Sequence, residues 1–298
     1  MLCEDLVQLL FPRVEHAPSE ATQSAVRLLL QRLVRGIEQG LGISQESSIP
    51  KSWDILCRSG LLREQALVEF ALARIAEEQI SSRINDGKPE IFNQIAAQLL
   101  SCKDTVLAQA ARNLLIAESA IERQTAESLL LQMPAELLHM ILWRVVAVFQ
   151  SGAVDGGSDY VKRGNVLLSA HDESLTAGAT AAKLVYFLPD DIRPDLNDPL
   201  RAGLSLYVGG LAWEFRLSHD RVLRFIDEEP VAPLLVLLRA RGTDAQSAIS
   251  ISLYLRGERA DDYRLPILLA QYEAIDAELA RSTILQWRLG TDARGTVE

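Results

Sequence analysis

Residues 221–256 read RVLRFIDEEP VAPLLVLLRA RGTDAQSAIS ISLYLR, and this stretch decides the fold. The run over residues 234–238 has almost no polar face, which predicts a helix that is buried nearly all round. Gly242 follows closely spaced arginines, a combination typical of a helix C-terminus. Thr243, with Gln246 three residues later, forms a capping-box pattern that starts a second helix at once. The stretch therefore predicts two helices joined as an αα-hairpin.

The same pattern recurs on both sides of this hairpin. An apolar stretch over residues 206–215 is followed by Ser218 as a cap and by a second apolar stretch over 222–226. A looser copy covers residues 272–287, with Asp276 as its cap. The repetition predicts an all-α protein of stacked antiparallel helical hairpins, HEAT-like or another α–α superhelix. An all-helical protein can also repeat this pattern by chance.

Composition agrees with a helical protein and argues against nucleic acid as a partner. Hydrophobic residues make up 48% of the chain but aromatic residues only 6%, and alanine and leucine favour helices over strands. The net charge of −10 repels a polyanion, and lysine and arginine form no cluster. Cys3, Cys57 and Cys102 are odd in number and form no CxxC pair, so neither a disulfide framework nor a zinc site is expected.

Two features of the sequence favour a cytoplasmic protein that does not enter a membrane. The first residues, MLCEDLVQLLF, are acidic and lack the basic region of a secretory signal. The longest apolar run, residues 137–149, is interrupted by His139 and Arg144 and is too short to span a bilayer. In a helix over 134–149, Glu136 shares one sector with these two residues, which predicts a solvent-facing stripe.

The clearest break in the sequence lies near its midpoint. Residues 151–159 carry three glycines and no hydrophobic periodicity, which indicates a flexible break. We expect an N-terminal helical lobe over 1–150 and a C-terminal lobe of helical hairpins over 160–298. The alternative is one continuous array with a long loop. Apolar spacing predicts the helices of the first half over 2–11, 19–40, 53–57, 61–80, 91–100, 106–117, 121–131 and 134–149, with Ser119 and Glu122 capping the helix at 121.

Two acidic clusters contain residue types that catalysis uses. They are the run from His171 to Ser174 and the carboxylates of residues 227–229. Neighbours on a helix point in different directions, and acids at a helix start are ordinary partners of the helix dipole. We therefore interpret both clusters as helix-capping groups. The four histidines are scattered without metal-ligand spacing, so no metal, cofactor or catalytic residue is expected.

The four tryptophans, Trp53, Trp143, Trp213 and Trp287, lie at helical apolar spacing and are interpreted as core residues. Protein interfaces favour tryptophan, so one of the four can instead mark a binding surface. Trp287, which is followed by Arg288, is the candidate interaction surface because it lies near the end of the chain.

The C-terminal half resembles a bacterial family catalogued as domain of unknown function 2336. The resemblance rests on VAPLLVLLRARG at 231–242, TDAQSAISISLYLRG at 243–257 and LPILLAQYEAIDAELARSTILQWR at 265–288. It covers roughly residues 170–289, and most of the matching positions are helix-packing residues. The resemblance implies an all-α, helical-repeat-like protein and assigns no catalytic residue.

Without a catalytic constellation, the sequence predicts a non-enzymatic α-helical module that binds another protein, in a scaffold or regulatory role. The alternative is a sensor that binds a small ligand in a pocket between the helical lobes. A third hypothesis is an enzyme that uses the carboxylates of residues 227–229 or His171. It requires these side chains to converge in one pocket.

Overall fold

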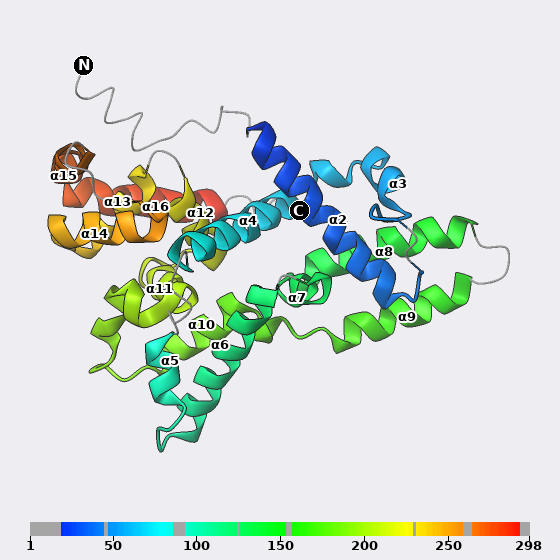
Figure 1. Cartoon of the computed structure of the whole chain (residues 1–298), viewed down its shortest axis with the longest axis horizontal. Helices are drawn as coiled ribbons and strands as arrows, with labels where there is room; N and C mark the ends of the chain where they lie inside the picture. Colours follow the sequence, from blue (N-terminus) through cyan, green and yellow to red (C-terminus); the bar gives the residue numbers. More distant parts are fainter. Residues whose placement is uncertain are drawn as a thin grey trace. The chain divides into compact units, whose positions relative to one another are not determined.

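The computed structural model describes residues 19–44, 47–85, 93–123, 125–152, 157–228, 231–258 and 264–292. These residues form fifteen α-helices and three short 3-10 helices, with no strand among them (Figure 1). The predicted all-α class is therefore confirmed, whereas the superhelical arrangement stays a prediction. Within these ranges, no helix combines the length and the apolar character that crossing a membrane requires.

The helices follow one another with short connections. The α-helices are α2 (Glu20–Gly40), α3 (Trp53–Arg58), α4 (Gln65–Asn85), α5 (Gln94–Leu99), α6 (Thr105–Arg123), α7 (Ala126–Leu131), α8 (Ala135–Gly152), α9 (Gly157–Ala170), α10 (Ala177–Phe187), α11 (Pro199–Phe215), α12 (His219–Asp227), α13 (Ala232–Arg241), α14 (Ala245–Arg256), α15 (Arg264–Ala274) and α16 (Ala277–Asp292). The 3-10 helices are η1 (Leu61–Arg63), η2 (Glu173–Leu175) and η3 (Arg193–Asn197). The helix predicted over 2–11 lies outside the described residues, as does Cys3.

The chain divides into two compact units, each made of separate stretches of sequence. Among the described residues, unit 1 takes in those of 76–99 and 184–292, and unit 2 those of 19–75 and 100–183. Helix α8 continues to residue 152 and α9 begins at residue 157, so both extend into the break expected at 151–159. Both helices lie in unit 2, where they pack against each other. The division thus falls at positions other than that break, of which residues 153–156 lie outside the described ranges.

The core of unit 2 is built around α2, as its apolar spacing predicts. Leu30, Leu33 and Ile37 are fully buried on one face of this helix and pack with apolar side chains of α3 and α8. Trp53, at the start of α3, is only 1% exposed, which agrees with its interpretation as a core residue.

A buried carboxylate holds the loop that follows α2. Glu38 has no exposed surface, and its Oε1 accepts hydrogen bonds from the backbone N–H of Ser52 at 2.8 Å and from the Ser52 hydroxyl at 2.7 Å. Its Oε2 accepts from the N–H of Lys51 at 3.1 Å. A buried charge requires such partners, so Glu38 fixes the loop onto α2.

The structure corrects one interpretation of polar residues in unit 2 and confirms another only in part. Ser119 does not cap a helix, because α6 continues through it and its hydroxyl donates to the carbonyl of Leu115 at 2.9 Å; Thr125 caps α7 instead. The solvent-facing stripe expected on α8 is present in part. Glu136 and His139 are exposed, whereas Arg144 is half-buried, with a side chain that is 32% exposed, and its Nη2 donates to Glu64.

Unit 1 has the predicted hairpin near its centre. Residues 232–238 are all buried, so α13 is surrounded as its continuous apolar run predicts. Gly242 ends α13 in the left-handed conformation, with φ of 84°. One detail differs: Asp244, rather than Thr243, caps α14, because its carboxylate accepts from the N–H of Ser247 at 2.9 Å. Ser218 caps α12 as expected.

Helix α11 is kinked where α5 packs against it within unit 1. Gly203 has φ of 70° and ψ of 168° inside this helix, a conformation that favours glycine. A Cβ at this position would lie 3.2 Å from the Cβ of Asn93, the residue that precedes α5. The kink and the missing side chain together allow this close approach.

Candidate functional site

The candidate interaction residues Trp287 and Arg288 lie on α16 in unit 1. The Trp287 ring is half-buried against Phe225 of α12, with ring centroids 4.5 Å apart. The carbonyl of Trp287 also accepts from Nη1 of Arg221 at 2.7 Å. Arg288 is half-buried as well. Packing of α12 against α16 therefore uses part of the Trp287 surface, and binding of a partner here stays a prediction.

Trp213 is more exposed to solvent than Trp287. The side chain of Trp213, in the last turn of α11, is 48% exposed, so its interpretation as a core residue is wrong. Trp143 is half-buried, and its Nε1 donates to Nε2 of His139 at 3.0 Å. Helical spacing could not separate these cases, because the outward face of α11 also carries apolar residues.

Trp213 belongs to a cluster that we call the aromatic surface, formed by Tyr186, Phe187 and Trp213 in unit 1. Tyr186 is 61% exposed and Phe187 39%. The Tyr186 ring lies 5.1 Å from that of Phe187 and 5.8 Å from that of Trp213, both edge to face. Tyr186 thus contacts both of the other rings, while all three side chains remain open to solvent. Sequence patterns did not predict this cluster, because Trp213 of α11 is 26 or more residues away from Tyr186 and Phe187 of α10.

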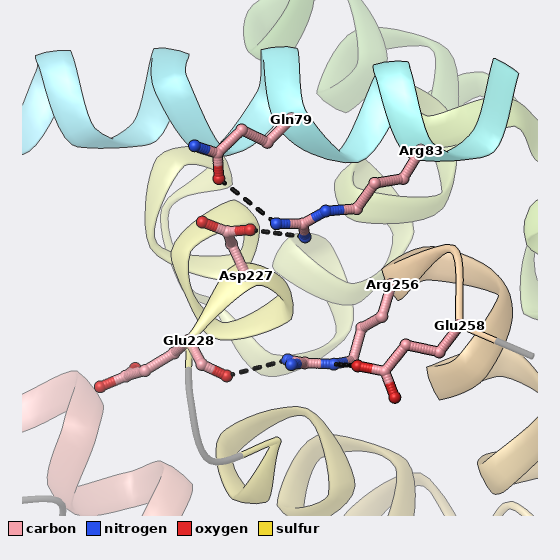
Figure 2. Close-up of polar contacts among 6 residues, drawn as sticks. All are labelled: Gln79, Arg83, Asp227, Glu228, Arg256 and Glu258. Atoms are coloured by element: carbon pink, nitrogen blue, oxygen red, sulfur yellow. Dashed lines mark hydrogen bonds and ion pairs between the residues drawn. The ribbon is translucent and has the colours of Figure 1, made fainter. Parts of the chain in front are cut away.

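The carboxylates of residues 227–229 do not form an acid–base pair in the part that the structure describes. Asp227 is the last residue of α12, where the negative end of the helix dipole disfavours a carboxylate. Nη1 of Arg83 offsets this charge by donating to Oδ1 of Asp227 at 2.8 Å. The side chain of Glu228 points away from Asp227 (Figure 2). Glu229 lies outside the described residues.

Burial affects the pKa of Glu228 more than the charges of neighbouring residues do. Desolvation raises the pKa of its carboxyl above the ordinary value, and the positive charges of Arg224 and Arg221 oppose that rise. The backbone carbonyl of Glu228 accepts from Nη1 of Arg256 at 3.2 Å, which attaches the end of α12 to the end of α14 (Figure 2). These contacts hold helix ends together.

The cluster at 171–174 serves local structure in unit 2. A ring nitrogen of His171 lies 2.9 Å from the carbonyl oxygen of Met133, and Asp172 accepts from the N–H of Ser174 at 3.0 Å as the cap of η2. Hydrogen bonds from the side chain and from the backbone N–H of Ser174, with a smaller contribution from His171, lower the pKa of Asp172. The capping role expected for Asp172 is confirmed. Across the described ranges, no three or more His, Cys, Asp and Glu residues are placed to hold a metal ion.

A polar cleft is the second candidate site. It has a volume of about 770 Å³ and lies within unit 1, between η3 with the first turn of α11 and the turn that joins α13 to α14. The cleft is lined by aspartate, arginine, serine, threonine and tyrosine side chains and by two amides, together with the apolar residues Pro194, Pro199, Leu200 and Ile251. A volume between roughly 300 and 1,000 Å³ is typical of small-molecule sites.

Comparison with known proteins adds no relative. No protein-family model matches the chain, and neither a curated protein nor a solved structure matches it. The resemblance of residues 170–289 to domain of unknown function 2336 therefore stays a prediction.

Proposed function

We propose that this chain is a non-enzymatic α-helical interaction module and that the aromatic surface binds a partner protein. The observation that carries the proposal is the contact of the Tyr186 ring with the rings of Phe187 and Trp213, at exposures between 39% and 61%. Protein interfaces are enriched in tyrosine, tryptophan and phenylalanine. A few such residues supply most of the binding free energy.

The backbone beneath the aromatic surface supports a rigid binding site. Tyr186 and Phe187 occupy the last turn of α10, and Leu188, the next residue, is 2% exposed. Trp213 follows residues 205–211 of α11, all of which are buried. Anchored positions lose little conformational entropy on binding, so these rings are suited to recognition.

The chemistry of the rings defines the partner that fits them. Three clustered aromatic faces favour an apolar side chain, such as leucine or methionine, that packs among them. Tyrosine and tryptophan also carry hydrogen-bonding groups at the ring edge, which suit backbone carbonyls beside that side chain. We therefore expect a partner segment with an apolar anchor.

The candidate catalytic groups make structural contacts, which supports a non-enzymatic role. Asp227 is paired with Arg83 at the end of α12, and Asp172 caps η2.

The test compares binding by the full chain and by its variants. Tyr186→Ala combined with Trp213→Ala should abolish recovery of the partners that the wild-type chain captures from its native cytoplasm by quantitative cross-linking. Ile267→Ala is the matched control, because Ile267 is an apolar residue of unit 1 that is 45% exposed and lies outside the cluster. Trp287→Ala tests the other candidate surface. Circular dichroism should show that all variants remain helical.

Two results would contradict this proposal. Recovery of the same partners by the double variant would exclude the aromatic surface as the binding site. Loss of those partners with Trp287→Ala alone would place binding on α16 instead.

A further inference from the structure

The polar cleft contains a buried cation with an unused hydrogen-bond donor. The side chain of Arg241 lines the cleft and is only 9% exposed. Its Nε donates to Glu214 at 2.7 Å, and its guanidinium carbon lies 6.0 Å from the centre of the Tyr207 ring. Its Nη1 is buried and makes no hydrogen bond. An unsatisfied buried donor costs free energy, so the guanidinium favours any acceptor that enters the cleft.

Tyr254 supplies a second unused polar group to the same cleft. Its hydroxyl is buried and makes no hydrogen bond, although the residue lines the cleft from the third turn of α14. Burial raises the pKa of this hydroxyl to about 12, and the negative charge of Asp198 adds to the effect. The hydroxyl is therefore protonated at neutral pH and can both donate and accept a hydrogen bond.

The charges that line the cleft indicate which ligand fits. Three aspartates line it, Asp195, Asp198 and Asp244, against two arginines, Arg201 and Arg241. Arg201 forms an ion pair with Asp195, and Arg241 forms one with Glu214. The excess of negative charge disfavours an anion. A ligand that only donates hydrogen bonds would leave Arg241 unsatisfied.

A hydroxyl group carries no charge and can also satisfy Arg241, because it accepts from a guanidinium and donates to a carboxylate at the same time. Asp198 and Asp244 cap α11 and α14 through one oxygen each, Oδ1, so carboxylate acceptors stand at both walls. Ser247 and Ser250 also line the cleft, and the Ser250 hydroxyl donates to the carbonyl of Gln246 at 2.9 Å.

We propose that the cleft binds a neutral, polyhydroxylated small molecule, a cyclic polyol or a sugar of one or two rings, through Arg241, Tyr254 and the aspartates of the helix caps. Nη1 of Arg241 and the Tyr254 hydroxyl are buried in the free protein, so each of these side chains turns toward the cleft when a ligand hydroxyl bonds to it. The proposal concerns a site separate from the aromatic surface and does not depend on the partner protein.

The first experiment is a binding screen on the full chain by saturation-transfer-difference NMR. The neutral probes are myo-inositol, glucose and a set of neutral disaccharides, whereas inorganic phosphate, acetate and ethanolamine supply the charged comparisons. Saturable binding of at least one neutral probe, with a lower dissociation constant than any charged probe, is the expected result. Absence of saturable binding by every neutral probe, or tighter binding of a charged one, would overturn the proposal.

The second experiment removes one hydroxyl. Tyr254→Phe deletes a group that has no partner in the free protein, so the variant should unfold at no lower a urea concentration than the wild type. Its affinity for the neutral probe should fall on the order of fivefold or more, the effect of one hydrogen bond. Tyr207→Phe is the matched control: this hydroxyl is also buried without a partner, but it does not line the cleft. Equal affinities in wild type and Tyr254→Phe would refute the assignment.

Discussion

Nη1 of Arg83 lies 2.8 Å from Oδ1 of Asp227, so the C-terminal ends of α4 and α12 are joined across 144 residues of sequence. The end of α14 meets them at the same place, where Nε of Arg256 donates to Glu258 at 3.0 Å and Nη1 of Arg256 donates to the carbonyl of Glu228 (Figure 2). Three helix ends of unit 1 therefore meet in one set of polar contacts.

Close packing at this meeting point predicts that Gly257→Ala is strongly destabilising. Gly257 ends α14 with φ of 62°, and a Cβ there would lie 2.7 Å from the Cβ of Arg83. Gly242 is the matched control, because its φ is 84° but a Cβ there meets nothing within 4 Å. We expect Gly242→Ala to cost about 1–2 kcal/mol in the free energy of unfolding. Gly257→Ala should cost about 1–3 kcal/mol more. Equal urea unfolding midpoints would contradict this packing.

Burial of α13 predicts a large effect of truncating Leu237. The side chain is 0% exposed, so Leu237→Ala should lower the free energy of unfolding by about 2–5 kcal/mol. Leu285 of α16, in the same unit, is 50% exposed, and Leu285→Ala should cost about 1 kcal/mol or less. Chemical denaturation of the two variants measures the difference. Comparable losses would mean that α13 is not surrounded by other helices.

The buried carboxylate of unit 2 should be sensitive to a change of one atom. Glu38→Gln replaces one acceptor oxygen with a donor that faces other donors, so we expect a loss of about 1–3 kcal/mol in the free energy of unfolding. Glu136 is exposed on α8 of the same unit, and Glu136→Gln should change stability by less than about 0.5 kcal/mol. Thermal and urea unfolding would reveal whether the two variants differ. A neutral effect of Glu38→Gln would show that Ser52 and Lys51 find other acceptors.

The raised pKa of Glu228 predicts a pH dependence with a definite sign. The folded state favours the protonated carboxyl more than the unfolded state does, whose pKa is near 4.5. The contribution of this group to stability is complete below that value and is lost as pH rises through the folded pKa. Glu228→Gln removes the loss, so the variant should match the wild type at about pH 4 and exceed it at about pH 7. Urea unfolding at both values provides the test, and parallel behaviour of the two proteins would argue against burial of Glu228.

Local sequence patterns predicted those features of the helices that depend on the residues of one helix alone. The run over 232–238 contains no polar residue, so it could only form a helix with neighbours on every side. Ser218 and Asp276 were identified as caps because a cap needs only its own helix. Ser119 shows the limit of this reasoning. A serine followed by a glutamate three residues later also fits inside a helix, where its hydroxyl bonds to the preceding turn.

The functional surfaces were less predictable because they depend on contacts between distant residues. Arg144 finds Glu64 at a separation of 80 residues, and no periodicity along α8 can indicate that pair. The cleft likewise arises where η3 and the start of α11 face the α13–α14 turn. Spacing identified Trp213 as apolar and helical but could not show that its side chain is 48% exposed.

Unit 1 takes α5 from the first third of the chain and most of its helices from the last, and this arrangement has a consequence for synthesis on the ribosome. Residues 93–99 emerge long before α11, against which α5 packs beside the Gly203 kink. The nascent α5 therefore lacks its native packing partner while the intervening stretch over 100–183 is translated. A fragment that starts at residue 160 never receives this helix, and it would expose the groove beside Gly203 to chaperones and proteases.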